Sequence, residues 1–267
     1  IGVGGFASEA YKLTDAERFR CAEIVADEAS GAPLIIGMAP GSTEAAIEQA
    51  RSYSRFQPAA LMVLPPNIMQ LDEAAIVEHY VHLAGASPAP IMVQQSPHIM
   101  GYAGCALSVD ALATIAEQTP NVAYFKIEGP GSAARIAGLR ERLGDRVTLF
   151  GGVGGLGLRE ELQAGASGLL PGVGFNEYFL AIWDAWTRGE TDDVDRLLTT
   201  VDPLVRAVSA QGHEYSLHAR KYLLRRAGTI TTARVRQPTV AVDPAGLQAL
   251  GRLVDGMTLR ISVESKG

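Results

Sequence analysis

Short apolar runs alternate along the chain with longer amphipathic segments. The apolar runs show little polar alternation, as is typical of strands buried on both faces of a parallel sheet. We therefore predict seven strands, at residues 1–5, 33–38, 60–64, 90–94, 122–126, 148–152 and 168–172.

The segments between these runs have the periodicity of helices. Thr14 opens the first of them, and Glu17 follows at the interval that a capping box requires. Helices are predicted at 14–30, 42–56, 72–85, 108–118, 131–144 and 158–166. After about Phe175 only helical patterns remain, at 176–190, 192–212, 214–228 and 243–257.

The alternation of strands and helices predicts an α/β fold. A (β/α)8 TIM barrel needs eight strands, so the count of seven implies that the first βα unit precedes residue 1. A doubly wound sheet is the weaker alternative, because no Gly-x-Gly-x-x-Gly turn with a distant acid follows the first strand. We expect the barrel at 1–180 and a C-terminal helical extension, packed on the same domain, at 181–267.

Composition narrows the possible functions. The 267 residues are 47% hydrophobic and 19% charged, with a formal net charge of −6 and a pI near 5.4. This balance, without a block of Lys and Arg, argues against non-specific binding to nucleic acid or to an anionic membrane. No apolar run reaches the roughly 18 residues needed to span a bilayer. Cys21 and Cys105 lack metal-type spacing, which favours two reduced thiols in a cytoplasmic protein.

One charged side chain stands in the apolar strand predicted at 122–126. Side chains alternate across a strand, so Lys126 shares its face with Tyr124 and Val122. It also ends the strand, on the side where barrels place their catalytic groups. An amine there could attack a carbonyl carbon and form a Schiff base. A lysine that snorkels from the strand end into solvent fits the spacing equally well.

The motifs around this lysine are those of a known family. The stretch "GGFASEAYKLTDAER" (4–18), followed by the strand-borne "YFKIE" (124–128), resembles the dihydrodipicolinate synthase and N-acetylneuraminate lyase superfamily of class I aldolases. The matching positions are Gly5, Glu9, Leu13, Thr14, Glu17 and Arg18. The resemblance extends through "GGVGG" and "GASGLLPG" to the helical tail. It implies that Lys126 is the Schiff-base lysine.

Several other positions depart from the family pattern. Phe6 and Ala7 replace two hydroxyl residues that bind the substrate carboxylate, and Ser8 replaces a glycine. Gln94 stands where the family has a proton-relay tyrosine, and a glutamine amide does not transfer protons near neutral pH. The loop at 64–70 has no tyrosine, and the loop at 98–104 lacks the usual arginine. These losses indicate altered chemistry, an altered substrate or an inactive relative.

The candidate site follows from this comparison. Glu128, two residues after Lys126, could hold the ammonium form or act as a general base, or it could be a solvated acid. Tyr102 is a further titratable group on the same face, whereas Tyr124 is expected to pack in the core. We therefore predict the catalytic residues to be Lys126, Glu128 and Gln94. The predicted substrate-binding residues are Phe6, Ala7, Ser8, Gln95, His98, Gly152 and Val153.

The predicted activity is a lyase, aldolase or dehydratase step on a small 2-oxo acid or a related carbonyl compound. The resemblance implies a homotetramer or homodimer and no metal or organic cofactor. The glycine-rich run at 151–157 leaves a different function open, because its backbone N–H groups could bind phosphate in a barrel enzyme without an imine. A tight turn with positive φ explains the same glycines.

Overall fold

The computed structural model describes residues 1–67, 70–99 and 101–257. Residues 258–267 of the predicted extension lie outside this part. The chain forms two compact units, the first of residues 1–153 and 157–170 and the second of residues 154–156 and 171–267.

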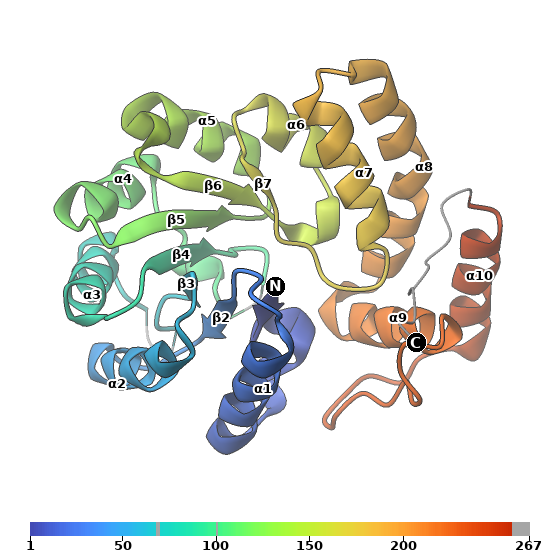
Figure 1. Cartoon of the computed structure of the whole chain (residues 1–267), viewed down its shortest axis with the longest axis horizontal. Helices are drawn as coiled ribbons and strands as arrows, with labels where there is room; N and C mark the ends of the chain where they lie inside the picture. The colour runs from blue at the N-terminus through green and yellow to red at the C-terminus, as the bar shows by residue number, and fades with distance from the viewer. Residues whose placement is uncertain (68–69, 100, 258–267) are drawn as a thin grey trace. The chain divides into compact units, whose positions relative to one another are not determined.

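A curled, parallel, seven-stranded sheet forms the centre of the first unit (Figure 1). Its strands pair in the order of the sequence, and all pairs are parallel. The strands are β1 (Gly2–Val3), β2 (Ile35–Met38), β3 (Ala60–Val63), β4 (Ile91–Gln95), β5 (Val122–Ile127), β6 (Thr148–Gly151) and β7 (Gly168–Leu169). This confirms the predicted α/β fold and the seven strand positions. The first and last strands are shorter than predicted, and the βα unit expected before residue 1 stays a prediction.

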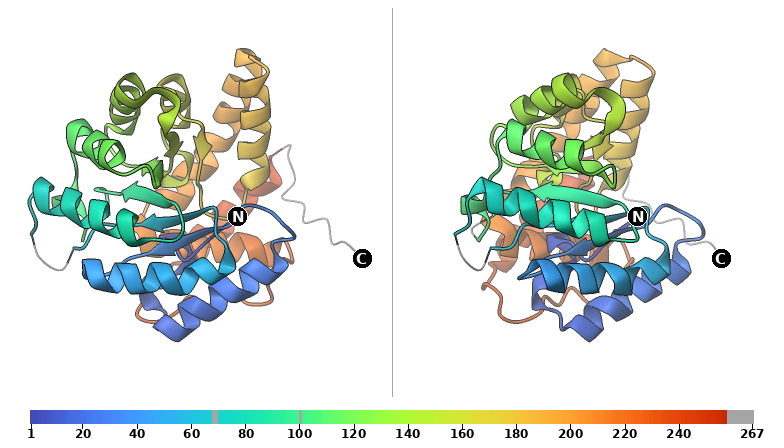
Figure 2. Two further views of the ribbon diagram at one scale, coloured as in Figure 1. Left: turned by 60° about the vertical axis from the view of Figure 1, so that its left-hand side comes forward. Right: turned by 90° about the vertical axis from the view of Figure 1, so that its left-hand side faces the viewer.

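Helices cover the outer face of this sheet. The helices of the first unit are α1 (Asp15–Glu28), α2 (Thr43–Tyr53), α3 (Glu73–Ala86), α4 (Val109–Gln118), α5 (Ser132–Leu143) and α6 (Leu158–Gln163). Figure 2 shows α1 to α5 along the outside of the strands. The large apolar core lies between them, where Val93, Phe125 and Leu149 of the strands meet Leu112 and Ile136 of the helices.

Four of the predicted helix starts in the first unit, those of α1 to α4, are confirmed by their capping hydrogen bonds. The Thr14 hydroxyl accepts from the Glu17 N–H at 3.3 Å, and a Glu17 carboxylate oxygen accepts from the Thr14 N–H at 2.8 Å, which completes the capping box. Ser42, Asp72 and Ser108 cap α2, α3 and α4. The N-terminal boundaries were therefore readable from local side-chain chemistry.

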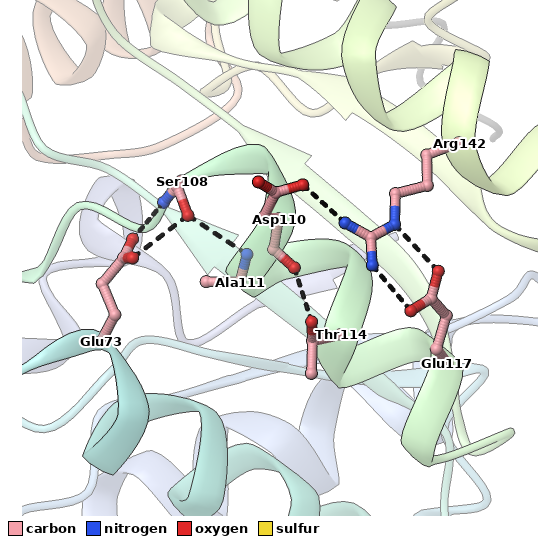
Figure 3. Close-up of polar contacts among 7 residues, drawn as sticks. All are labelled: Glu73, Ser108, Asp110, Ala111, Thr114, Glu117 and Arg142. Atoms are coloured by element: carbon pink, nitrogen blue, oxygen red, sulfur yellow. Dashed lines mark hydrogen bonds and ion pairs between the residues drawn. The ribbon is translucent and has the colours of Figure 1, made fainter.

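Polar side chains also tie neighbouring helices together (Figure 3). The Ser108 hydroxyl, which caps α4, donates to Glu73 of α3 at 3.1 Å. Arg142 of α5 forms two hydrogen bonds with the carboxylate of Glu117 in α4, at 2.9 and 2.8 Å, and a third with Asp110 at 2.6 Å. These exposed contacts join α3 to α4 and α4 to α5 at the surface.

The inner face of the sheet carries a smaller apolar cluster. Ala60, Met62 and Met92 are buried in it, and Tyr124 and Phe150 pack against it. Tyr124 is thus part of the packing, as predicted. Because side chains alternate along a strand, Gln94 and Lys126 lie on this same inner face, one step nearer the C-terminal strand ends.

The second unit is helical, as the pattern after Phe175 predicts. Its helices are α7 (Asn176–Thr187), α8 (Thr191–Ser209), α9 (Gly212–Arg226) and α10 (Pro244–Asp255). Its buried apolar side chains include Phe175, Tyr178, Ile182, Val201, Leu204, Val205, Val208, Leu217 and Leu223. None of the helices in the described ranges of the chain has the length and apolarity to cross a membrane.

Candidate active site

Lys126 lies at the end of β5, on the inner face of the sheet. It is in register with Gln94 of β4 and with Phe150 of β6. Only 12% of its side chain is exposed, and its Nζ atom lies 3.3 Å from Oε1 of Glu128. The lysine therefore does not snorkel into solvent, which removes one of the two interpretations that the spacing allowed.

Glu128 is held by four groups. Lys126 Nζ and the Val153 N–H, at 2.9 Å, contact its Oε1 atom. The Gln94 amide donates to Oε2 at 3.0 Å, and the Ser96 hydroxyl donates to the same oxygen. Its side chain is 7% exposed, so Glu128 is a buried carboxylate and not the solvated acid that was the alternative.

The charge of Glu128 is stabilised by this arrangement. Burial by itself would raise the pKa of its carboxyl group. The Lys126 ammonium acts against burial, together with the Ser96 hydroxyl, the Val153 N–H and the Gln94 amide, and the pKa of Glu128 lies below its usual value. Glu128 is consequently ionised at neutral pH and can accept a proton.

Two glycines allow buried carboxylates to approach the backbone after β6. A Cβ atom on Gly152 would lie 2.1 Å from Glu128 Oε1. A Cβ atom on Gly151 would lie 1.8 Å from Oε2 of Glu161, which belongs to α6. Any larger residue at either position would displace a carboxylate. The "GG" at 151–152 therefore makes room for two acids.

Glu161 is the second acid and differs from Glu128 in its partners. It is 1% exposed, its Oε1 atom accepts from the Ser132 hydroxyl at 2.6 Å, and its Oε2 atom has no hydrogen-bond partner. Burial is the main cause that raises the pKa of Glu161 to about 7. The charges of Glu128 and Glu160 add to the effect of burial, and the hydrogen bonds from Ser132 and the Gly152 backbone oppose it.

The pKa of Glu161 predicts a pH-dependent stability. The folded-state pKa, about 7, lies above the unfolded value near 4.5, so the stabilisation is full below pH 4.5 and is lost as the pH rises through 7. Above pH 7 the cost is about 3 kcal/mol. We expect Glu161→Gln to remove this fall in the free energy of unfolding between pH 5.5 and 8.5, measured by urea titration.

A matched control for this variant is Glu160→Gln, which changes an exposed acid in the same helix. It should lose stability with pH as the wild type does. An equal fall with pH in wild type and Glu161→Gln would contradict the assignment.

The remaining predicted residues are distributed around the strand ends. Phe6, Ala7 and Ser8 form a 3₁₀ turn after β1, with Ala7 and Ser8 exposed. The Phe6 ring contacts Tyr102, with ring centroids 5.8 Å apart, so the loops after β1 and β4 meet. The Gln95 amide oxygen accepts from the Leu107 N–H at 2.8 Å. Their proposed contacts with a substrate stay predictions.

His98 lies near the charged pair. Its ring faces Gly129, where a Cβ atom would lie 3.1 Å from Nδ1. His98 is an exposed residue whose ring is partly covered by its neighbours. This partial burial lowers the pKa of His98; the nearby Glu128 charge raises it and the Lys126 charge lowers it. A neutral imidazole is therefore present beside the pair at neutral pH. Residues 68 and 69 of the loop at 64–70, and residue 100 of the loop at 98–104, lie outside the described residues.

The glycine-rich run after β6 is a turn that requires positive φ. Val153, Gly154, Gly155 and Gly157 have φ values of 48°, 64°, 96° and 86°. These values support the tight-turn interpretation, and phosphate binding by the run stays a prediction. Within the described ranges, no group of three or more His, Cys, Asp or Glu side chains is arranged to hold a metal ion.

Ser96 and Glu161 belong to the site but were not predicted from the sequence. Ser96 is two positions after Gln94, on the same face, and this spacing matches that of Glu128 after Lys126. This equal spacing on two neighbouring strands was the only feature of the sequence that could have indicated that Ser96 lies beside Glu128. Glu161 gave no signal, because only the packing of α6 against the turn after β6 buries it.

A family model with the description "Dihydrodipicolinate synthetase family" matches residues 1–256. The chain is 31% identical over 261 residues to an L-2-keto-3-deoxyarabonate dehydratase of Azospirillum brasilense, covering 95% of this chain and 82% of that relative. It is 28% identical to a probable 5-dehydro-4-deoxyglucarate dehydratase of Pseudarthrobacter chlorophenolicus, over 57% of this chain and 47% of that relative. The fold matches the crystal structure of dihydrodipicolinate synthase from Aquifex aeolicus with a TM-score of 0.86, at 19% identity over 96% of this chain and 85% of that one.

Proposed function

Because this chain belongs to the dihydrodipicolinate synthetase family, we propose that it is a Schiff-base lyase that dehydrates a small 2-oxo-3-deoxy sugar acid. The observation that carries the proposal is the buried contact between Lys126 Nζ and Glu128, at 3.3 Å, at the C-terminal end of β5. The similarity to a dehydratase of a 2-keto-3-deoxy acid supports the choice of substrate class.

The reaction begins at the 2-oxo group. Lys126, after transferring a proton to Glu128, attacks C2 as a neutral amine, and loss of water gives an iminium ion. This cation withdraws electrons and acidifies the hydrogens on C3. Removal of one C3 proton gives an enamine, which expels the C4 hydroxyl group as water once that group is protonated. Hydrolysis of the imine then frees the amine for another turnover.

Glu128 is suited to the proton steps. It is ionised and it lies next to the amine. Three further donors, from Gln94, Ser96 and Val153, still hold the carboxylate in place once Lys126 has become neutral. Gln94 and Ser96 therefore act as positioning residues for the carboxylate, in place of a direct proton relay by a tyrosine. Glu128, once it has taken the C3 proton, is the proposed donor to the leaving hydroxyl group, and His98, neutral and close to the pair, is proposed to hydrogen-bond that group.

The substrate is proposed to lie over the strand ends. The exposed 3₁₀ turn at 6–8 and the turn at 152–153, whose backbone also holds Glu128 and Glu161, border this region, and Gln95 and His98 lie at the same end of β4. The loss of the usual hydroxyl residues at Phe6 and Ala7 argues against ordinary condensation of pyruvate. The homo-oligomer implied by the resemblance and the cytoplasmic location expected from Cys21 and Cys105 remain predictions.

Borohydride trapping tests the proposal. The protein is reduced with borohydride in the presence of L-2-keto-3-deoxyarabonate and, separately, of pyruvate, and then digested and analysed by mass spectrometry. We expect a reduced adduct on the peptide that contains Lys126, together with consumption of the sugar acid in an unreduced sample.

Three outcomes separate the alternatives. An adduct with turnover supports the lyase. An adduct without turnover of any 2-oxo-3-deoxy acid leaves an imine-forming but inactive relative. Absence of an adduct, under conditions that trap a family member of known activity, excludes the Schiff base and favours a barrel enzyme that works without an imine.

A further inference from the structure

Arg220 is a buried arginine in the second unit. It belongs to α9 (Figure 1), and only 7% of it is exposed. Its Nη1 atom donates to the carbonyl oxygen of Val173 at 2.7 Å, and its Cζ atom lies 5.0 Å from the ring centroid of Phe175. Both contacts come from the segment that leads into α7. They orient the guanidinium group, but neither carries a negative charge.

The charge of Arg220 is not balanced by the described chain. Within residues 1–67, 70–99 and 101–257, no carboxylate forms an ion pair with it. Burial alone lowers the pKa of Arg220 to about 10. A guanidinium group has five N–H donors, and charges buried in proteins are normally paired. An anion that is not part of the described chain would complete the site.

Two glycines let the backbone pack directly against the guanidinium group of Arg220. A Cβ atom on Gly172 would lie 2.8 Å from Cζ, and one on Gly154 would lie 2.9 Å from Nη2. Gly154 comes from the glycine-rich run and also has a positive φ of 64°. Side chains at either position would therefore press on the guanidinium. The two glycine segments and α9 enclose it with backbone atoms and one aromatic face.

We propose that Arg220 is the centre of an anion-binding site in the second unit, which takes a compact oxyanion group, either a carboxylate or a phosphate. A guanidinium fork binds such groups through two parallel hydrogen bonds. In this site the glycine-rich run contributes through the contact of Gly154 with Arg220, and the N-terminus of the short helix α6 takes no part. The site uses none of the residues of the proposed Schiff-base chemistry, so a test of the anion site is independent of a test of the proposed function.

Calorimetric titration tests the site. The whole chain is titrated with inorganic phosphate and, in a separate arm, with malonate, and thermal unfolding is followed with each anion. We expect saturable binding of at least one anion at one site per chain, with a Kd on the order of 1 mM or lower, and an increase in Tm.

Variants assign the binding to Arg220. Arg220→Met should weaken binding at least about tenfold, because a charge-assisted hydrogen bond is lost. Arg220→Lys, which keeps the charge but not the fork, should bind with intermediate affinity. Gly172→Ala should weaken binding with the charge intact. Arg225→Met, which changes an exposed arginine of the same helix, should bind as the wild type does.

Circular dichroism shows which variants fold. If Arg220→Met does not fold, the test rests on Arg220→Lys and Gly172→Ala. Binding of phosphate alone assigns the site to a phosphate group, and binding of malonate alone assigns it to a carboxylate. Failure of both anions to saturate by about 10 mM overturns the proposal. So does unchanged affinity in the folded Arg220 variants.

Discussion

Lys126→Ala is expected to reduce turnover of a 2-oxo-3-deoxy acid to less than about a thousandth of the wild-type rate. No other lysine is placed on the inner face of the sheet among the described residues, so the iminium ion cannot form. Borohydride trapping should be lost with it. The measurement is a steady-state assay of dehydration combined with mass spectrometry of the reduced protein.

The matched control is Lys126→Arg. Arginine keeps a positive charge beside Glu128, at the position where the lysine nitrogen lies 3.3 Å from the carboxylate. It cannot form an imine, because its guanidinium stays protonated. We expect Lys126→Arg to fold like the wild type and to be as inactive as Lys126→Ala. Substantial turnover in either variant would mean that the reaction does not pass through an imine on this residue.

Glu128→Gln is expected to lower kcat by about 10² to 10⁴, the range over which a positioned acid or base contributes. Glutamine keeps the size of the side chain, and its single carbonyl oxygen can still accept from either Ser96 or Val153, which bind different oxygens of Glu128. It cannot take a proton from the amine or from C3. Borohydride should still trap the adduct on Lys126, though more slowly because Glu128 no longer takes the proton of the amine. This result distinguishes the loss of proton transfer from the loss of the nucleophile.

The pH dependence gives an independent readout of Glu128. The carboxylate is the active form, and its pKa is held below the usual value despite burial, by Lys126 and the neighbouring donors. Activity should therefore decline on acidification only below the ordinary pKa of a glutamic acid, as the pH falls through the lowered value. A wild-type acidic limb near pH 6 would contradict this role. Glu160→Gln, an exposed substitution, should leave kcat and the profile unchanged.

Local sequence signals predicted the elements of the fold well. Thr14 and Glu17 form the expected capping box because both hydrogen bonds join residues three positions apart, and such contacts need no tertiary partner. The seven strands lie where the apolar runs are, since a strand buried on both faces must be apolar throughout. The boundaries at 168–172 and 158–166 were less accurate. There β7 spans only Gly168–Leu169, and α6 ends at Gln163, just before Gly165 with its positive φ.

The site was predicted in part. Alternation along β5 placed Lys126 on the inner face, and the same rule placed Gln94 beside it once the strands were paired in sequence order. The burial of Glu128 and its four donors could not be derived in this way, because they come from β4, β5 and the turn after β6. Ser96 and Glu161 were missed for the same reason.

The sequence by itself determined the order and type of the elements, the strand end that carries the lysine, and the family to which the chain belongs. These are properties of local periodicity and of residues close together along the chain. Only the tertiary structure decided the electrostatics. Whether Lys126, Glu128, Glu161 and Arg220 are charged, paired or strained depends on which groups from distant segments surround them. Burial and neighbouring charge act through distance in space, which no pattern along a single chain encodes.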